Sequence, residues 1–297
     1  MNATTLRQLR YVETLDRTNH FGRAADLCAV SQPALSTAVA ALEAEFGLPL
    51  FERSTRGVRP TPFGARVAER ARAILRGVDD LHALALAERG ALRGRIGLGI
   101  IPTVAPYLLP TLAGLLAGRH PDVELRVRES VTATLVAEVT DGRLDAAILA
   151  LPLGRAGLVE RPLLAEPFVL VRPAADAARP VPDAAGLRAE RLLLLEEGHC
   201  FRDQALAYCD GASDAGLEGS SLTTLVQMVA AGMGVTLIPR MAVATETARA
   251  DVAVSPFADP VPSRRLALVW RRSNPLADRL AELADTVEAA AHAVAAT

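Results

Sequence analysis

The apolar pattern of this 297-residue chain changes its period at about Gly94. Before that point apolar residues recur at helical spacing, as Leu6, Leu9 and Val12 do. After it, apolar runs of strand length alternate with helical stretches. One hydrophobic core seldom organises so many residues, so two or more domains are expected. The pattern therefore predicts a helical N-terminal domain followed by an α/β domain.

The first sixty residues predict a helix-turn-helix. After the first helix, a second short helix fits residues 21–28 (FGRAADLC), and a break follows at Val30. Ser31 then stands in an N-cap position with Pro33 in the first turn, and Gly47 ends the third helix. Two short helices, a tight turn and a capped third helix are typical of this motif.

The segment after the third helix is rich in turn formers and arginine. LFERSTRGVRPTPFG (residues 50–64) predicts a two-stranded wing, and a long helix is expected over residues 61–89. Residues 50–76 hold seven arginines against two glutamates, a local balance of +5, although the whole chain has a formal charge of −2. We expect this surface to face nucleic-acid phosphates.

The second half predicts more strands than one small sheet needs. We therefore expect parallel sheets with crossovers, arranged as two α/β subdomains with a cleft between them. The expected strands are RIGLGII, VELRVRES, AAILAL, FVLVRP, LLLLEEG, VTLIP and LALVWRR. Helices are expected after Pro110, over residues 132–145 and 221–234, and from Pro275.

Several broad classes are excluded by composition and pattern. No apolar run reaches the ~18 residues that a membrane span needs, and the N-terminus lacks the apolar core of an export signal. We expect a cytoplasmic protein without a membrane partner. Three cysteines in a reducing compartment argue against a disulfide framework. Cys28, on the inner face of its helix, is interpreted as a small core residue.

Residues 21–64 resemble the DNA-binding region of LysR-type transcriptional regulators. The likeness is carried by AA (24–25), SQPALS (31–36), the Leu-Glu pair (42–43), LFER (50–53) and T-x-x-G (61–64). The rest of the chain is similar to the effector domain of that family in length and in its order of strands and helices. The resemblance implies a regulator that binds double-stranded promoter DNA, contacts RNA polymerase and assembles as a homodimer or homotetramer.

The resemblance also implies a domain plan. A winged helix-turn-helix is expected over residues 1–60, a linker helix that dimerises over 61–91, and an effector domain over 92–297. The effector domain would consist of two α/β subdomains that resemble periplasmic binding proteins. Subdomain I would take about 92–164 and 267–297, and subdomain II about 165–266.

The third helix is expected to read DNA. A recognition helix presents its N-terminal side chains to base edges in the major groove. The candidates here are Ser31, Gln32, Pro33, Ser36 and Thr37. Arginines of the wing would position the phosphate backbone; these are Arg53, Arg56 and Arg59. Alternatively, Ser31 is only an N-cap and Gln32 a solvated first-turn residue.

Three stretches of the second half are similar to OxyR-type peroxide sensors within the LysR family. They are GIIPTVAPYLLP (99–110), LLEEGHCFRDQALAYC (194–209) and MVAAGMGVTLIP (228–239), of which the second discriminates. The resemblance implies an activator of oxidative-stress genes that responds to hydrogen peroxide. It implies that peroxide oxidises Cys200 and that a Cys200–Cys209 disulfide changes the effector domain and promoter binding.

The residues themselves suit this chemistry. Cys200 lies at an expected strand-to-helix corner beside Arg202, where a thiolate is favoured. A thiolate attacks peroxide to give a sulfenic acid, which a second thiol resolves. If residues 201–209 are helical, they span roughly 13 Å, whereas a disulfide needs Cα atoms about 4.4–6.8 Å apart. Oxidation would therefore unwind this segment, and the strained bond would be readily reduced again.

The resemblance places a peroxide pocket around Cys200, formed by Thr103, Thr132, His199, Gln204 and Arg265. Hydroxyls donate to and accept from peroxide, and a cation stabilises the hydroxide that develops. Two alternatives stay open: Thr132 as the N-cap of the next helix, and Arg264 in place of Arg265. The segment between Cys209 and Ser221 is short for the family, which leaves its contacts in doubt.

Other functions compete with this hypothesis. A LysR-type regulator could bind a small organic effector in the cleft between the subdomains, with both thiols incidental. An enzyme or a solute-binding protein is a third hypothesis, but no catalytic triad, nucleotide or cofactor motif supports catalysis. A metal site at His199, Cys200 and Cys209 is disfavoured, since adjacent His and Cys rarely converge on one tetrahedral ion. We expect no enzyme, cofactor or metal.

Overall fold

The computed structural model describes residues 4–54, 57–87, 94–209 and 217–296. The chain divides into two compact units, Met1–Ala85 and Leu86–Thr297, and each is described by itself. Arg56 and most of the short segment after Cys209 lie outside the described residues.

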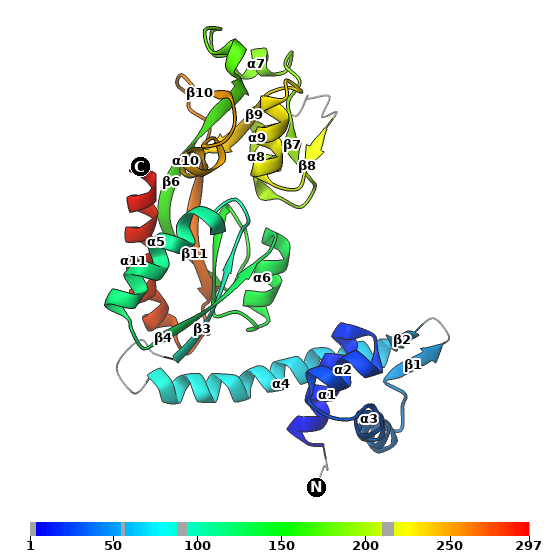
Figure 1. Cartoon of the computed structure of the whole chain (residues 1–297). Coiled ribbons are helices and arrows are strands. Elements are labelled where there is room, and N and C mark those ends of the chain that lie inside the picture. The colour runs from blue at the N-terminus through cyan, green and yellow to red at the C-terminus, as the bar shows by residue number, and fades with distance from the viewer. Residues whose placement is uncertain (1–3, 55–56, 88–93, 210–216, 297) are drawn as a thin grey trace. The chain divides into compact units, whose positions relative to one another are not determined.

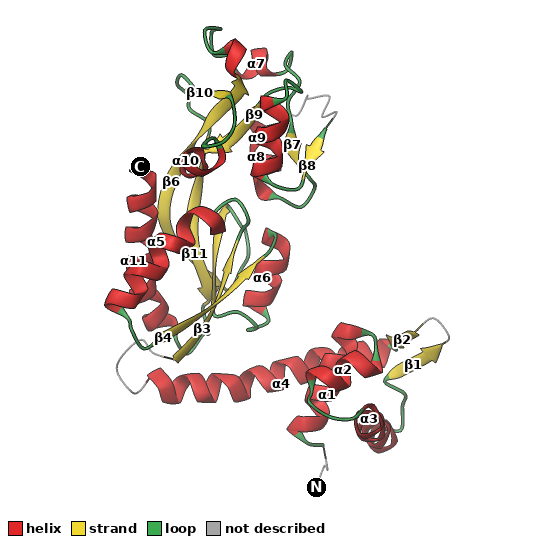
Figure 2. Ribbon diagram, in the orientation of Figure 1, coloured by secondary structure: helices red, strands yellow, loops and turns green. Residues whose placement is uncertain are grey.

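The first unit is the predicted winged helix-turn-helix followed by a long helix (Figures 1 and 2). Its elements are α1 (Leu6–Thr18), α2 (Phe21–Leu27), α3 (Gln32–Phe46), β1 (Phe51–Ser54), β2 (Gly57–Pro60) and α4 (Pro62–Ala87). Strands β1 and β2 pair antiparallel, with Phe51 opposite Pro60. The apolar stripes close one core, in which Val12, Leu15 and Leu35 are fully buried.

Helix α3 is fixed at both ends by its own sequence. The Ser31 side chain caps the first turn by accepting from the Ala34 N–H at 3.4 Å. Gly47 ends the helix in the left-handed conformation at φ 68°. Near that end, Glu43 Oε1 accepts from the N–H groups of Leu50 and Phe51 at 2.7 and 3.1 Å. The Leu-Glu pair of the motif thus ties α3 to the wing.

The T-x-x-G motif has a physical reason at the start of α4. The Thr61 hydroxyl donates to the Pro49 carbonyl at 2.8 Å and accepts from the Gly64 N–H at 2.9 Å. A Cβ at Gly64 would lie 1.8 Å from the Leu50 carbonyl oxygen, so no larger residue fits there.

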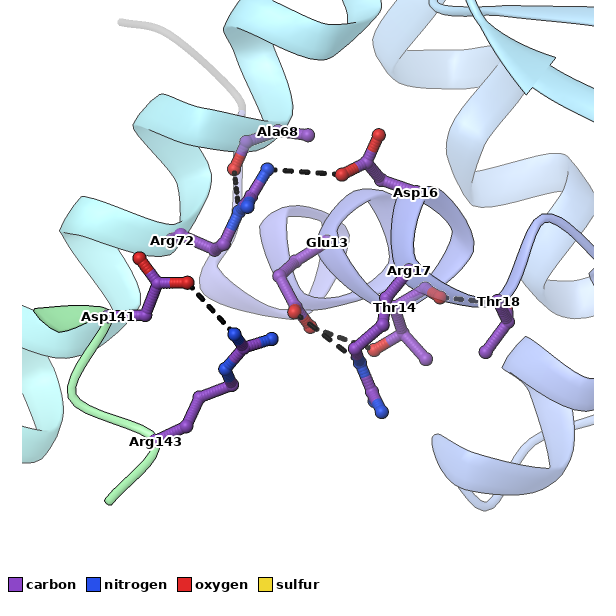
Figure 3. Close-up of polar contacts among 9 residues, drawn as sticks. All are labelled: Glu13, Thr14, Asp16, Arg17, Thr18, Ala68, Arg72, Asp141 and Arg143. Carbon is purple, nitrogen blue, oxygen red and sulfur yellow. Dashed lines mark hydrogen bonds and ion pairs between the residues drawn. The ribbon is translucent and has the colours of Figure 1, made fainter. Parts of the chain in front are cut away.

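Helices α1 and α4 are joined by a partly buried ion pair (Figure 3). Arg72 Nη2 lies 3.1 Å from Asp16 Oδ2, while Arg72 Nε donates to the Ala68 carbonyl at 3.3 Å. Burial raises the pKa of Asp16, and the Arg72 charge offsets part of that rise. On α1, Glu13 and Arg17 form an i,i+4 pair at 3.6 Å.

The second unit is built on a seven-stranded mixed sheet of order β10-β6-β11-β5-β3-β4, with β9 also paired to β6. Its strands are β3 (Gly94–Ile100), β4 (Val123–Glu129), β5 (Ala146–Leu151), β6 (Leu158–Pro173), β9 (Thr236–Pro239), β10 (Val252–Pro256) and β11 (Ser263–Arg271). A small parallel pair, β7 (Leu194–Leu195) and β8 (Glu218–Gly219), lies apart from it. Strand β6 is long enough to pair with β11 along its first part and with β9 and β10 near its end.

Helices cover both faces of the first half of this sheet. Helix α5 packs against α11, and α6 lies on the opposite face (Figure 2). The helices are α5 (Ala105–Arg119), α6 (Thr132–Thr140), α7 (Ala184–Leu187), α8 (Cys200–Tyr208), α9 (Leu222–Ala230), α10 (Val243–Glu246) and α11 (Ala277–Ala295), with single turns η1 (Ala174–Asp176) and η2 (Arg240–Ala242).

Three expectations for this unit need correction. The sheet is mixed, because β11 runs antiparallel to both β5 and β6. Helix α5 begins at Ala105 and contains Pro110, since buried Leu108 and Leu112 hold its first turns against the core and Pro110 faces solvent. Helix α6 ends at Thr140, because Gly142 turns the chain at φ 68°. Arg143 pairs with Asp141 there at 3.0 Å (Figure 3).

In the described ranges, no single helix is long and apolar enough to cross a membrane; α2 and α3 satisfy that test only when counted together across a 102° bend. No three His, Cys, Asp or Glu side chains of the described residues gather as a metal site.

Candidate functional sites

Cys200 is the first residue of α8. It follows Gly198, whose φ of +94° makes the turn from the β7 strand end, and the N-cap residue His199. The Cys200 side chain is half-buried. In the first turn of the helix, Cys200 lies near backbone N–H groups that have no partner within the helix and near the positive end of the helix dipole.

Cys209 is the C-cap of the same helix and is fully buried. Its carbonyl accepts from Arg188 Nε at 3.1 Å. Neither thiol is joined in a disulfide in this structure. The two cysteines are nine positions apart along the helix, which corresponds to about 13 Å of rise. The helical expectation for this segment is therefore met, and a disulfide requires α8 to unwind.

Aromatic contacts hold α8 in its helical form. Phe201 is buried and meets the Phe168 ring edge-on, with centroids 4.9 Å apart. At the other end, Tyr208 meets Phe257 at 5.4 Å. Burial raises the pKa of Tyr208, and the neighbouring Cys209 and Asp183 add to that rise.

A narrow crevice runs beside Cys200. It does not admit a water-sized sphere, so side chains must move before a peroxide enters. The end of β3, the start of α6 and the start of α8 form it. Of the predicted pocket residues, Thr103, Thr132 and His199 line it with Cys200.

Arg265, the predicted pocket arginine, is exposed and does not line the crevice. Arg264, the alternative, has no exposed side-chain surface; it does not line the crevice either, but it bonds to Thr103, which does. Neighbouring residues of a strand point to opposite faces, so only one of the two can point into the interior from β11. Arg264 Nη1 donates to Thr103 Oγ1 at 2.6 Å, and Nη2 donates to the Thr103 carbonyl at 3.0 Å.

A buried carboxylate, Glu166, completes this arrangement and was not singled out from the sequence. Its Oε2 accepts from Arg264 Nε at 2.7 Å, and its side chain is 1 % exposed. Its Oε1 accepts from the Met241 N–H at 2.9 Å. The sequence does hold one sign of this role: Glu166 stands just before the apolar run FVLVRP of β6. A carboxylate buried beside such a run needs a cationic partner.

Two buried polar atoms near Cys200 have no hydrogen-bond partner among the described residues. They are Thr132 Oγ1 and Gln204 Oε1. Thr132 is not the N-cap of α6, because Val131 takes that position. Both side chains line a cleft of about 550 Å³ that also borders Cys200 and Arg155. Unpaired buried polar atoms of this kind call for a polar ligand or water.

Arg202, which was expected to favour the Cys200 thiolate, is engaged in other bonds. Its Nη1 donates to the Leu195 carbonyl at 2.9 Å and to Glu218 Oε1 at 2.6 Å. The guanidinium therefore joins α8 to β7 and β8, and it does not line the crevice. Arg264 contacts the lining of the crevice through Thr103.

The predicted nucleic-acid surface lies at the start of α3. Gln32, Pro33 and Thr37 are exposed, Ser36 is half-buried, and Ser31 serves as the N-cap while remaining exposed. The exposed Arg59 stands on β2, whereas the Arg53 side chain and Arg56 lie outside the described residues. Of the helix arginines counted earlier, Arg66 and Arg70 are exposed, and Arg72 is committed to Asp16.

Comparison with known families matches both halves of the chain. A model described as "Bacterial regulatory helix-turn-helix protein, lysR family" matches residues 6–65, and one described as "LysR substrate binding domain" matches residues 89–291. A "Probable hydrogen peroxide-inducible genes activator" of Streptomyces viridosporus is 46 % identical over 288 residues, covering 94 % of this chain and 92 % of the relative.

Solved structures with similar folds include full-length OxyR variants. One from Pseudomonas aeruginosa has a TM-score of 0.77 and 40 % identity, covering 97 % of this chain and 95 % of its own. A hydrogen peroxide-bound cysteine-to-serine variant from Corynebacterium glutamicum has a TM-score of 0.69 and 36 % identity, covering 99 % of this chain and 95 % of its own.

Proposed function

The chain belongs to the LysR family of bacterial transcriptional regulators, and from that premise we propose that it senses hydrogen peroxide through Cys200 and Cys209. The observation that carries the proposal is the placement of two cysteines, not joined in a disulfide, at opposite ends of one helix. One thiol borders a crevice with hydroxyl groups, and the other is buried where the helix ends. The relatives named for hydrogen peroxide support the same reaction.

The chemistry is a two-electron oxidation of sulfur. The Cys200 thiolate attacks one oxygen of H₂O₂, the O–O bond breaks, and the second oxygen leaves as hydroxide, which takes a proton to become water. Cys200 is now a sulfenic acid. The Cys209 thiol attacks that sulfur, forms the S–S bond and releases a second water. Peroxide is thus a signal consumed once per oxidation, and the protein is a regulator rather than an enzyme.

Thr103 and Arg264 prepare the first step. The Thr103 hydroxyl oxygen already accepts from Arg264, so its own hydrogen is free to donate elsewhere. Thr103 lines the crevice with Cys200, and a donor at this place stabilises the departing oxygen as charge develops on it. Thr132 and Gln204, with their unpaired oxygens, are proposed to orient the peroxide, and His199 borders the same space.

Disulfide formation converts this chemistry into a change of shape. Joining the two sulfurs removes Cys209 from its buried site and pulls α8 apart, because the helical Cα separation is too long. The contacts of Phe201, Tyr208 and Arg188 are then lost or remade. A two-state element biased by redox chemistry is the requirement for a switch.

The output is promoter binding. We infer that α3 enters the major groove with Gln32 and Thr37 at base edges, while Arg59 contacts phosphate. Helix α4 presents exposed Ile74, Leu81 and Leu84, an apolar stripe that supports dimerisation through this helix. A homodimer or homotetramer in the cytoplasm, activating oxidative-stress genes with RNA polymerase, is the assembly we propose.

A second candidate is regulation by a small organic effector in the 550 Å³ cleft, favoured by its unpaired Thr132 and Gln204 oxygens and by Arg155. Peptide mass spectrometry after about one equivalent of H₂O₂, with free thiols alkylated, separates the two. Loss of two hydrogens mapped to Cys200–Cys209, with Cys28 still alkylated, is expected. Three free thiols would refute peroxide sensing and favour the effector.

The disulfide step has its own test. The variant Cys209→Ser should form a sulfenic acid at Cys200, trapped by dimedone, without the change in tryptic pattern that accompanies oxidation of the wild type. An unchanged peroxide-driven tryptic pattern in this variant would contradict the disulfide. The DNA step is tested with Arg59→Ala, which should weaken binding to all sequences and flatten the salt dependence.

A further inference from the structure

The Arg264 guanidinium is held from two sides in the interior of the effector unit. Glu166 Oε2 contacts its Nε and Nη2, each at 2.7 Å, from β6. Thr103 contacts its Nη1 and Nη2 from the end of β3, at 2.6 and 3.0 Å. These contacts use four of the five N–H groups of the guanidinium. The cation is therefore committed to Glu166 and Thr103, and it acts on a peroxide through the Thr103 hydroxyl.

Glu166 is itself fixed by the backbone. Its second carboxylate oxygen accepts from the Met241 N–H at the start of η2. The carboxylate thus spans two elements that lie far apart in the sequence, and its side chain cannot rotate without losing a bond at one of its oxygens. The ring of Phe201, next to Cys200, lies 5.8 Å from the Arg264 carbon on another side of the guanidinium. The position of the Arg264 guanidinium therefore depends on Glu166 of β6.

We propose that Glu166 is a positioning residue for the reaction of Cys200 with peroxide, which it serves by holding Arg264 so that the Thr103 hydroxyl donates into the crevice. The inference rests on the proposed function. Arg264 can orient the Thr103 hydroxyl only while the guanidinium plane is fixed. Glu166 fixes that plane, because its carboxylate contacts Nε and Nη2 together. Without that acceptor a fully buried cation would turn toward another partner.

The polar surroundings of the pair are also buried. Tyr107 donates to Glu246 Oε1 at 2.7 Å, and both side chains are buried. Burial raises the pKa of Tyr107, with further contributions from Glu246 and Glu166, so Tyr107 remains a neutral donor. Tyr107 keeps Glu246 occupied by its own hydrogen bond. Among the acidic groups here, Glu166 is the one bonded to Arg264.

The test compares two reactions of the same sulfur. Peroxide needs a donor at its departing oxygen, whereas iodoacetamide loses iodide and needs none. In the Cys209→Ser background, Glu166→Gln should lower the rate of Cys200 sulfenic acid formation about 10- to 100-fold. The rate of Cys200 alkylation should change less than about twofold, because it reports only thiolate and access. Glu160→Gln, the same change at a half-buried site on β6, is the matched control and should alter neither rate.

A double-mutant cycle distinguishes positioning from a merely structural role. With Thr103→Val the hydroxyl that Glu166 serves is gone, so adding Glu166→Gln should cost little further peroxide rate. Additive losses, or an unchanged peroxide rate in Glu166→Gln, would overturn the proposal. Equal losses of peroxide and iodoacetamide rates would overturn it too. If wild-type Cys200 fails to react with peroxide at all, the proposed function falls and this inference falls with it.

A second variant guards against misfolding of the first. Glu166→Asp keeps the negative charge but shortens the side chain by one methylene. The carboxylate can then still pair with Arg264, but it no longer spans the distance between Arg264 and the Met241 N–H. An intermediate loss of peroxide rate is expected, again without loss of alkylation rate. The fluorescence of the single tryptophan, buried Trp270, reports whether each variant is folded. A wild-type peroxide rate in folded Glu166→Asp and Glu166→Gln would refute positioning by Glu166.

Discussion

Helices α3 and α8 carry the two proposed functions, and they are secured in different ways. Helix α3 has a side-chain cap at Ser31, a left-handed Gly47 at its end, and Glu43 bonded to the wing behind it. Helix α8 has His199 as its N-cap, which makes no capping bond with its side chain among the described contacts, and Cys209 as its C-cap. One helix is fixed by its own sequence; the other is held by tertiary contacts.

This difference suits a sensor. A DNA-reading helix has to keep one shape, so local bonds at its ends are an advantage. A redox helix has to change shape, so its stability should depend on contacts that oxidation can break, such as those of Phe201 and Arg188. The Arg264–Glu166 pair is a third case, since it is fully buried and is bonded to Thr103 and to the Met241 backbone.

The largest effect is expected at that buried pair. Arg264→Met leaves Glu166 as a buried carboxylate without its cation, which costs about 3–5 kcal/mol of unfolding free energy. Urea unfolding followed by Trp270 fluorescence measures it. Replacing both residues by methionine should recover most of the stability, because no charge is then left unpaired, but it should not recover the peroxide rate. A double variant as unstable as Arg264→Met would contradict this account.

The next effect tests the local fixing of α3. Glu43→Ala removes the acceptor of two backbone N–H groups, at Leu50 and Phe51, and should cost about 2–3 kcal/mol. Circular dichroism of thermal unfolding measures the loss. The exposed Glu45 on the same helix is the control, and Glu45→Ala should change stability by less than about 0.5 kcal/mol. Equal effects at both positions would remove the contrast between α3 and α8.

The two regions also differ in how well sequence predicts them. Caps and turns are local, so Ser31, Gly47 and the wing followed from residue order, and so did the helix that begins at Cys200. The choice between Arg264 and Arg265 did not follow, because the two differ only in which face of β11 each occupies. That phase is set by pairing with distant strands β5 and β6.

Long-range packing also explains the other differences. Glu166 gains its role from Arg264, which lies 98 positions later in the chain. Helix α5 runs through Pro110 because burial of its apolar face offsets the bond that proline removes. Local preference alone placed the start of the helix after Pro110. Helix and strand propensities predict which elements form, whereas contacts between residues far apart in the sequence decide which side chains form a site.

A smaller effect compares the two helices directly. Ala207 on α8 and Ala40 on α3 are both exposed, and glycine at either site should weaken its helix by about 1 kcal/mol. Ala207→Gly destabilises only the reduced form if oxidation unwinds α8. The midpoint potential of the Cys200–Cys209 couple should then fall by about 20 mV. Ala40→Gly should leave the potential unchanged, and a shift of equal size there would refute the comparison.

The smallest effect is expected where α4 meets α1. Burial raises the pKa of Asp16 despite the nearby Arg72 charge, so the folded protein binds a proton at Asp16 more readily than the unfolded chain does. The contribution of this group to stability is therefore greatest below its unfolded pKa and is lost as pH rises through the folded pKa. Asp16→Asn should accordingly change stability by less than about 1 kcal/mol at pH 7 and, in sign, should not destabilise. Urea titrations of both proteins at pH 7 and pH 3.5 measure the difference, which should shrink at the lower pH because Asp16 is then largely neutral as well. A clear loss of stability at pH 7 would show that Arg72 holds α4 to α1 through charge, and the DNA-binding unit would then depend on an ion pair as the peroxide crevice does.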